Sequence, residues 1–138
     1  MTRRSRGTAL VEFALCWPLA VLLVMLGVQL GVWGAESAAA HAAASAGARA
    51  ATVSGANAER GGLVALRSLA PALAGTRAGA WCPGQAPVAP QVWVCARDVR
   101  NGVEVSIGGT VPALIPVLGA NGLPVHADVT VQKETFMP

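Results

Sequence analysis

Charged residues are scarce in this sequence of 138 residues: 12% are Asp, Glu, Lys or Arg, while 54% are hydrophobic. Such a chain is hard to keep soluble without a bilayer, and its length allows one small domain beside a membrane segment. The net charge of +3 comes from Arg3, Arg4 and Arg6, because residues 8–138 hold seven basic and seven acidic residues. The basic balance therefore indicates membrane topology, and we expect no nucleic-acid-binding face.

Residues suited to catalysis and metal binding are also few. His41 and His126 are the only histidines, and neither Cys-x-x-Cys nor His-Glu-x-x-His occurs. No glycine loop is accompanied by the lysine or acidic residue that a nucleotide site requires. We therefore expect no catalytic residue, no metal and no cofactor, and a protein that is not an enzyme.

An uncharged run of 23 residues lies between Glu12 and Glu36. As a helix this run would measure about 35 Å and cross a hydrocarbon core of roughly 30 Å once. Trp17 and Trp33 lie near its two ends, where indole rings favour the headgroup layer. Because three arginines precede the run, we expect a single-pass protein of the cell membrane with a cytoplasmic amino terminus and an extracytoplasmic head.

A cleaved secretory signal peptide is the alternative for this segment. The apolar core of a signal peptide runs about 7–15 residues, which is shorter than this run, and Glu12 interrupts the place where it would be uniformly apolar. Its least unfavourable cleavage site lies near Ser37. Lipoprotein processing at Cys16 is disfavoured, because Leu15 is large where a small residue is needed.

The run Arg-Gly-Thr-Ala-Leu-Val-Glu-Phe-Ala-Leu at residues 6–15 is followed by Pro18 and by alanine-rich sequence up to residue 51. This pattern resembles the TadE-like pseudopilins of the tight-adherence (Flp) pilus system. The resemblance implies that a prepilin peptidase cuts between Gly7 and Thr8. Glu12 would then be the fifth mature residue, followed by the aromatic Phe13.

The acid at position 12 has a chemical reason to need a partner. An ionised side chain in a membrane helix costs about 2.5–3.5 kcal/mol at the helix centre and less toward the interface. Cutting after Gly7 would create an α-amine on Thr8, one helical turn from Glu12. The resemblance implies that Glu12 pairs with this amine on an adjacent subunit and sets the register between helices. Alternatively, Glu12 only reaches toward the headgroups at a helix amino terminus, where the helix dipole favours an anion.

These observations favour a structural role. We expect a minor pseudopilin or assembly subunit of a tight-adherence, type IV-like pilus, whose partners are the prepilin peptidase and other pilins or pseudopilins. The alternative is a single-pass anchored or secreted binding ectodomain with no filament role. That alternative would leave Glu12 unexplained.

The expected organisation is a basic leader over residues 1–7, a transmembrane and extended helix over 8–53, and an extracytoplasmic head over 54–138. Gly27 and Gly31 form a G-x-x-x-G pattern, which favours close approach of helices. Asn57 is expected to cap a second helix that runs to about Leu73. Its predicted apolar face consists of Leu63, Leu66, Leu69, Ala70 and Leu73.

Residues 75–90 have the composition of a linker, and beyond them the hydrophobic period becomes two. The alternation predicts three strands over residues 92–97, 103–107 and 125–131, with Asn101-Gly102 supplying positive φ angles in a tight hairpin. A sheet of this size needs helices to cover its apolar face. The fold class is therefore α+β: a long amino-terminal transmembrane helix that extends into a head of one helix and a three-stranded antiparallel sheet, as in a pilin.

Cys82 and Cys95 both fall on the expected external side. In an oxidising compartment they are expected to form a disulfide, which would close a loop of 14 residues and stabilise the head by about 3 kcal/mol. Two unpaired thiols, or a bond to a partner protein, are the alternatives.

Overall fold

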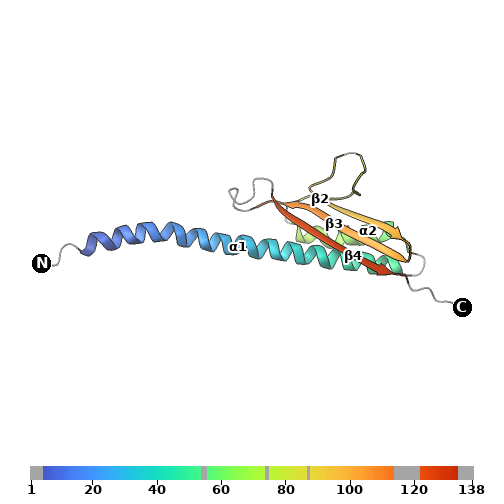
Figure 1. Ribbon diagram of the computed structural model, residues 1–138, viewed down its shortest axis with the longest axis horizontal. Coiled ribbons are helices and arrows are strands. Elements are labelled where there is room, and N and C mark those ends of the chain that lie inside the picture. The colour runs from blue at the N-terminus through green and yellow to red at the C-terminus, as the bar shows by residue number, and fades with distance from the viewer. Residues whose placement is uncertain (1–4, 54–55, 74, 87, 114–121, 134–138) are drawn as a thin grey trace.

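The chain folds into one long helix and a small head that is attached along the second half of that helix (Figure 1). The computed structural model describes residues 5–53, 56–73, 75–86, 88–113 and 122–133, with side chains from residue 11 onward. The first four residues of the expected leader lie outside this range. The architecture is α+β, as the sequence predicts.

Helix α1 (Ser5–Thr52) has 48 residues and remains helical through Pro18. It is about 72 Å long at the rise of an α-helix. It begins three residues before the predicted start at Thr8 and ends one residue before the predicted end.

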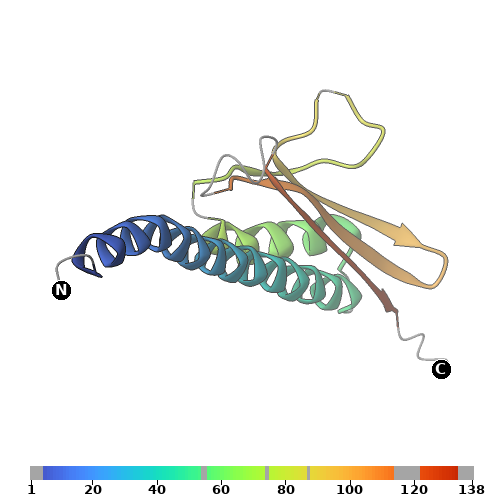
Figure 2. The ribbon, with the colours of Figure 1, turned by 60° about the vertical axis from the view of Figure 1, so that its left-hand side comes forward.

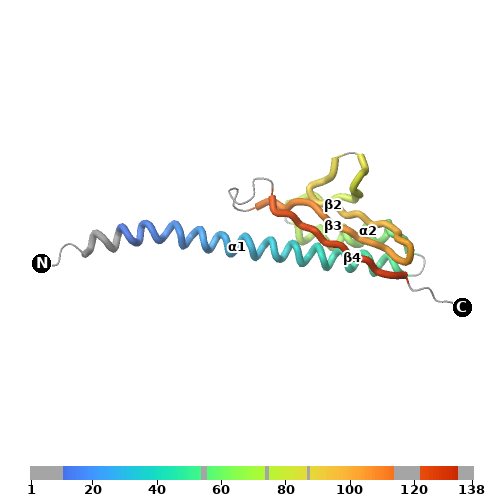
Figure 3. Tube along the Cα trace, viewed as in Figure 1, coloured from blue at the N-terminus to red at the C-terminus, as the bar shows by residue number. Residues whose placement is uncertain are grey.

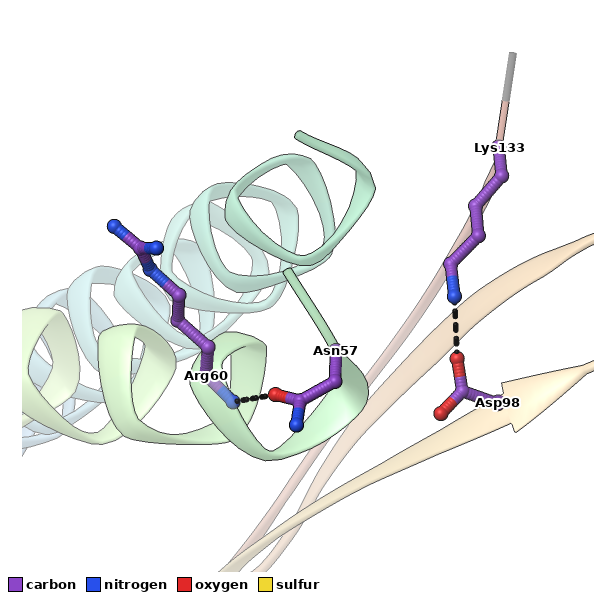
Figure 4. A network of polar contacts seen from close by, with 4 residues as sticks. All are labelled: Asn57, Arg60, Asp98 and Lys133. Atoms are coloured by element: carbon purple, nitrogen blue, oxygen red, sulfur yellow. Dashed lines mark hydrogen bonds and ion pairs between the residues drawn. The ribbon is translucent and has the colours of Figure 1, made fainter. Parts of the chain in front are cut away.

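Helix α2 (Ala58–Leu69) runs back beside α1 and continues as a single 3-10 turn, η1 (Ala70–Ala72), which contains Pro71. The predicted cap is present, because Asn57 Oδ1 accepts a hydrogen bond of 3.0 Å from the Arg60 backbone N–H (Figure 4). This bond satisfies one of the amide donors that a helix amino terminus leaves free.

The predicted apolar face of this helix is only partly right. Leu69 and Leu73 are buried, but Leu63 is 49% exposed and Ala70 is also exposed. The face that packs inward carries the small residues Ala58, Gly61 and Ala65, followed by Leu69 at the end of the helix. The reason is the closeness of α1, which leaves no room for large side chains between the two helices.

The two helices come closest at a pair of glycines. A Cβ atom on Gly47 would lie 2.6 Å from the Gly61 carbonyl oxygen and 2.8 Å from the Ala65 Cβ. A Cβ atom on Gly61 would lie 2.8 Å from the Ala51 Cβ. Such distances exclude a side chain at either glycine without movement of the backbones, so these residues fix how closely α1 and α2 pack.

The sheet has four strands in the order β1-β2-β3-β4. Their bounds are Ala78–Ala80 for β1, Val92–Val99 for β2, Gly102–Val111 for β3 and Leu123–Gln132 for β4. The last three strands are antiparallel neighbours, as predicted, while β1 pairs in parallel with β2. The prediction missed β1, because three small residues inside a linker-like stretch carry no strand signal of their own.

The β2–β3 hairpin is present, but its turn lies one residue earlier than predicted. Val99 pairs with Gly102, so Arg100 and Asn101 form the two-residue turn. Neither Asn101 nor Gly102 has a positive φ. Gly102 is instead a strand residue whose missing side chain lets the backbone of Val131 approach.

Both helices lie on the same face of the sheet (Figure 2). α1 packs against β3 and β4, and α2 packs mainly against β2. The core between these layers consists of alternate strand residues and small helix residues. Its buried strand members are Val92, Val94, Val103, Val105, Ile107, Val111, Val125 and Ala127. The head therefore stands beside the second half of α1 and leaves the first half uncovered.

Candidate functional site

The uncovered first half of α1 is the most unusual surface of the molecule. Every described side chain from Val11 to Val28 is exposed, although most of them are large and apolar. The most apolar 18-residue window of this helix has a mean hydropathy of 2.2, and none of it is buried. By length and composition α1 is able to cross a membrane, and exposed apolar surface of this extent indicates that lipid or other proteins surround it.

The residues expected to act in processing and assembly lie at the start of this surface. Gly7 and Thr8 are within the first turns of α1, and Glu12 follows one turn later with an exposed side chain. Phe13 is 64% exposed, and its ring stacks on Trp17 with centroids 5.9 Å apart. None of the ion pairs among the side chains from residue 11 onward involves Glu12. Among the side chains that the structure describes, none therefore supplies a cation to this carboxylate on the apolar surface.

Three glycines of α1, on both sides of the point where the head begins, form an open small-residue face. Cβ atoms placed on Gly27, Gly31 or Gly34 would have no neighbour within 4 Å, in contrast to Gly47. Among the described residues, the predicted G-x-x-x-G pair therefore has open space beside it, outside its own helix. Packing between α1 and α2 uses the other glycines, farther along the helix.

The head begins to cover α1 at Gln29, which is only 3% exposed. One turn later, Trp33 Nε1 donates a hydrogen bond of 3.0 Å to the backbone carbonyl of Pro124 in β4. This contact joins residues 91 positions apart in the sequence. It fixes the end of the sheet that lies nearest the uncovered part of the helix (Figure 3).

A disulfide and two tryptophans cover the opposite face of the sheet. Cys82 is bonded to Cys95, as the sequence analysis expects, and Cys95 is buried. The Trp81 and Trp93 rings meet edge to face with centroids 5.8 Å apart, and Trp93 lies against Gly108. The Trp81 indole N–H donates to the Gln85 carbonyl. This group holds the segment between β1 and β2 on the sheet.

The charged groups of the head form exposed pairs. Arg97 pairs with Glu104 at 3.3 Å. Lys133 Nζ lies 2.7 Å from Asp98 Oδ1 (Figure 4), and its hydrogen bond holds the pKa of Asp98 below the ordinary value. The Ala58 backbone N–H contributes to the same lowering of the pKa. These contacts tie the β2–β3 hairpin to the end of β4 and to the start of α2.

The histidines form no cluster with other metal-binding side chains. His126 Nε2 lies 2.6 Å from Asp128 Oδ2 on the exposed side of β4, and His41 is exposed on α1. Within the described ranges, no group of three or more His, Cys, Asp or Glu residues is close enough to hold a metal ion. Two polar residues on a solvated strand are a common surface pair, and among the described residues no third ionisable group joins this ion pair.

A comparison with protein families identifies the amino-terminal segment. Residues 7–49 match the family model of the TadE-like proteins. The match confirms the resemblance found in the sequence for this segment, which makes up about a third of the chain. The matched TadE-like region runs from Gly7 to Arg49, so it contains the expected cleavage glycine, Glu12, the uncovered apolar surface and most of the helix that packs in the head.

The rest of the chain lies outside the TadE-like match. No curated protein and no solved structure matches the chain. The head is therefore described by its own contacts alone. Sequence reasoning missed two of them, the Gly47–Gly61 crossing and the Trp33–Pro124 hydrogen bond, because each joins segments that no local pattern connects.

Proposed function

We propose that this chain is a minor pseudopilin or assembly subunit of a tight-adherence pilus, inserted in the membrane through α1. The observation that carries the proposal is the TadE-like match from Gly7 onward, over an apolar helix surface that its own head leaves bare. A structural subunit needs such a surface for lipid before assembly and for neighbouring helices afterward. The leader with Arg3, Arg4 and Arg6 supports a cytoplasmic amino terminus and an extracytoplasmic head.

We propose further that a prepilin peptidase cuts between Gly7 and Thr8. The new α-amine of Thr8 would then lie one helical turn from Glu12, about 6 Å along the axis. In an assembly of parallel helices, the amine of one subunit would pair with the Glu12 carboxylate of the next. Pairing would offset the cost of holding an ion near hydrocarbon, and it would favour one axial register over others.

The cut is tested by mass spectrometry of the intact protein extracted from membranes. We expect a mature chain that begins at Thr8. A Gly7→Val variant should stay uncut, because the peptidase has to accept a small residue next to the bond, whereas the neighbouring Ser5→Val variant should be processed. A chain that still begins at Met1, or one that begins near Ser37, would contradict the proposal and favour an anchored or secreted ectodomain.

The pairing of Glu12 is tested separately by co-purification with other pilins from the same membranes. Glu12→Ala should remain in the membrane but recover markedly less partner pilin. Val11→Ala is the matched control, because it shortens an exposed neighbour on the same turn without removing the charge. Recovery of the partner by Glu12→Ala at the level of the unchanged protein would refute the pairing.

A further inference from the structure

The head limits how much of α1 a bilayer can surround. The side chains of residues 11–28 are exposed, whereas Gln29 is buried and the Trp33 indole is hydrogen-bonded to Pro124 of the head, although Leu30 and Val32 between these two residues are exposed. Toward the amino terminus, the next charged residue after Glu12 is Arg6. Residues 7–28 lie between these limits, and as a helix they measure about 33 Å, close to the roughly 30 Å of a hydrocarbon core.

We compare two positions of α1 in the bilayer, with the hydrocarbon over residues 13–35 or over residues 7–28. If the hydrocarbon covered the uncharged residues 13–35, Gln29 would lie about 9 Å inside it, and the end of the sheet held by Trp33 would be drawn in as well. Backbone groups at the end of a sheet would then lose water, at several kcal/mol for each group left without a partner. If the hydrocarbon covers residues 7–28 instead, the Glu12 carboxylate lies within it, and the free-energy cost of placing it there is no more than about 3.5 kcal/mol. The second position is favoured.

Charge is distributed along the strands in a way that fits this second position. The end of the sheet near Trp33 holds the starts of β2 and β4 and the end of β3. No Asp, Glu, Lys or Arg occurs in the sequence between Glu104 and Asp128, the stretch that includes this end of β3 and β4. The opposite end of the sheet carries the charged residues of the β2–β3 hairpin and the lysine that follows β4. These residues are Arg97, Asp98, Arg100, Glu104 and Lys133.

The side chains at the end of the sheet near Trp33 are suited to a lipid surface. Pro112 and Pro124 are exposed, and Leu123 is half-exposed. Arg77, also exposed, precedes β1, whose first residue pairs with the first residue of β2 at this same end. Its guanidinium suits the phosphates of lipid headgroups, while an indole such as that of Trp33 favours the headgroup layer.

We propose that this end of the head, formed by Pro112, Leu123, Pro124 and Trp33, rests on the surface of the lipid bilayer at the level of the headgroups. The Trp33–Pro124 hydrogen bond then sets the height of the head above the hydrocarbon. Trp17 lies inside the hydrocarbon in this position, so only Trp33 serves as an interface anchor. The proposal requires that α1 crosses a membrane, and it is independent of cleavage and of pilus assembly.

The test places one nitroxide label at a time on the full chain in vesicles of phosphatidylethanolamine and phosphatidylglycerol. Cys16→Ser leaves no free thiol among the native cysteines, because Cys82 and Cys95 are bonded to each other. Pro124→Cys labels the proposed contact. Gln132→Cys is the matched control, because it is also exposed, on the same strand and the same side, about 26 Å away. Accessibility to oxygen, which concentrates in lipid, is compared with accessibility to a water-soluble nickel chelate.

We expect the ratio of oxygen to nickel accessibility to be several-fold higher at residue 124 than at residue 132. Pro112→Cys repeats the measurement at the residue that follows β3, in case the Pro124 variant fails to fold, and an intact Cys82–Cys95 bond serves as the check of folding. Equal ratios at both ends would overturn the proposal. Protection of residues 112 and 124 from both reagents would also overturn it, because a protein partner and not lipid would then cover this end.

Discussion

The two halves of α1 share one continuous backbone and have opposite surroundings. Residues 11–28 carry mostly large apolar side chains, and none of them is covered by the head. Beyond Gln29, where the head begins, the residues that the second half buries are all small: Ala40, Ala43, Ala44, Gly47, Ala48 and Ala51. The difference shows that side-chain size determines which part of the helix packs against the head and which part is left for other surroundings. Small residues let α2 and the sheet come close, while large apolar residues are left for lipid or for other subunits.

The largest effect is expected when the same charge is introduced into each half of α1. Leu22 is 58% exposed and Ala42 is also exposed, so neither arginine would clash within the chain. Leu22→Arg should weaken membrane insertion by about 2.5–3.5 kcal/mol, because residue 22 lies within the proposed hydrocarbon span. Ala42→Arg should have no such effect. The measurement is the fraction of protein that stays in the membrane after alkaline extraction, and equal retention of the two variants would contradict the division.

The next test compares two glycines of the same helix. Gly47→Ala should destabilise the head by about 1–3 kcal/mol, because its Cβ would overlap the backbone of α2. Gly31→Ala meets no atom within 4 Å and should leave the stability of the head unchanged. Urea unfolding in detergent, followed by circular dichroism, measures both. If both variants unfold at the same urea concentration as the unchanged protein, α1 and α2 do not pack through Gly47 and Gly61.

A smaller effect is expected where the two halves meet. Trp33→Phe removes the indole donor to the Pro124 carbonyl and should lower the free energy of unfolding of the head by about 1 kcal/mol. Trp17→Phe is the matched control, since Trp17 lies in the uncovered half and has no described contact with the head. The same urea titration separates them. A Trp17→Phe protein that loses as much stability as Trp33→Phe would mean that the head depends on the first half of the helix.

Much of the fold could be predicted because its signals are local. The long helix follows from an apolar and alanine-rich run, the cap at Asn57 from its residue type, and strands β2, β3 and β4 from alternation of polar and apolar residues. What failed depends on contacts between distant segments. Strand β1 forms only because Ala78–Ala80 lies beside β2. Leu63 is exposed because small residues, Gly61 and Ala65, occupy the face of α2 that packs closely against α1.

The candidate site was also predicted only in part from the sequence. Sequence alone identified the TadE-like segment, because the glycine, the glutamate and the apolar run lie close together in one helix. It placed the membrane span at residues 13–35, since charge was the only boundary that it offered. The head supplies a different boundary at Gln29, which becomes visible only when the chain is folded. If the membrane span lies nearer the amino terminus, as we propose, Glu12 lies inside the membrane. A charged partner for Glu12 is then needed more strongly, because an ionised side chain is costly there.

The smallest expected effect concerns the end of the head that is farthest from the proposed membrane surface. The Lys133 ammonium, through its hydrogen bond, holds the pKa of Asp98 below the ordinary value, so the folded state binds the proton of this group less readily than the unfolded chain does. The stabilisation is therefore fully present above the pKa of an unfolded aspartate, about 4, and is lost as the pH falls through the lower pKa of the folded state. Lys133→Met should reduce this loss of stability in acid, whereas Arg100→Met, which removes a cation from the same end, should not. Because the Lys133 and Asp98 side chains are both largely exposed, the difference in acid stability between the variant and the unchanged protein will be small. This difference should shrink further in high salt, because salt screens an exposed ion pair. Packing of α1 against α2 at the glycine crossing involves no charge and should not change with salt.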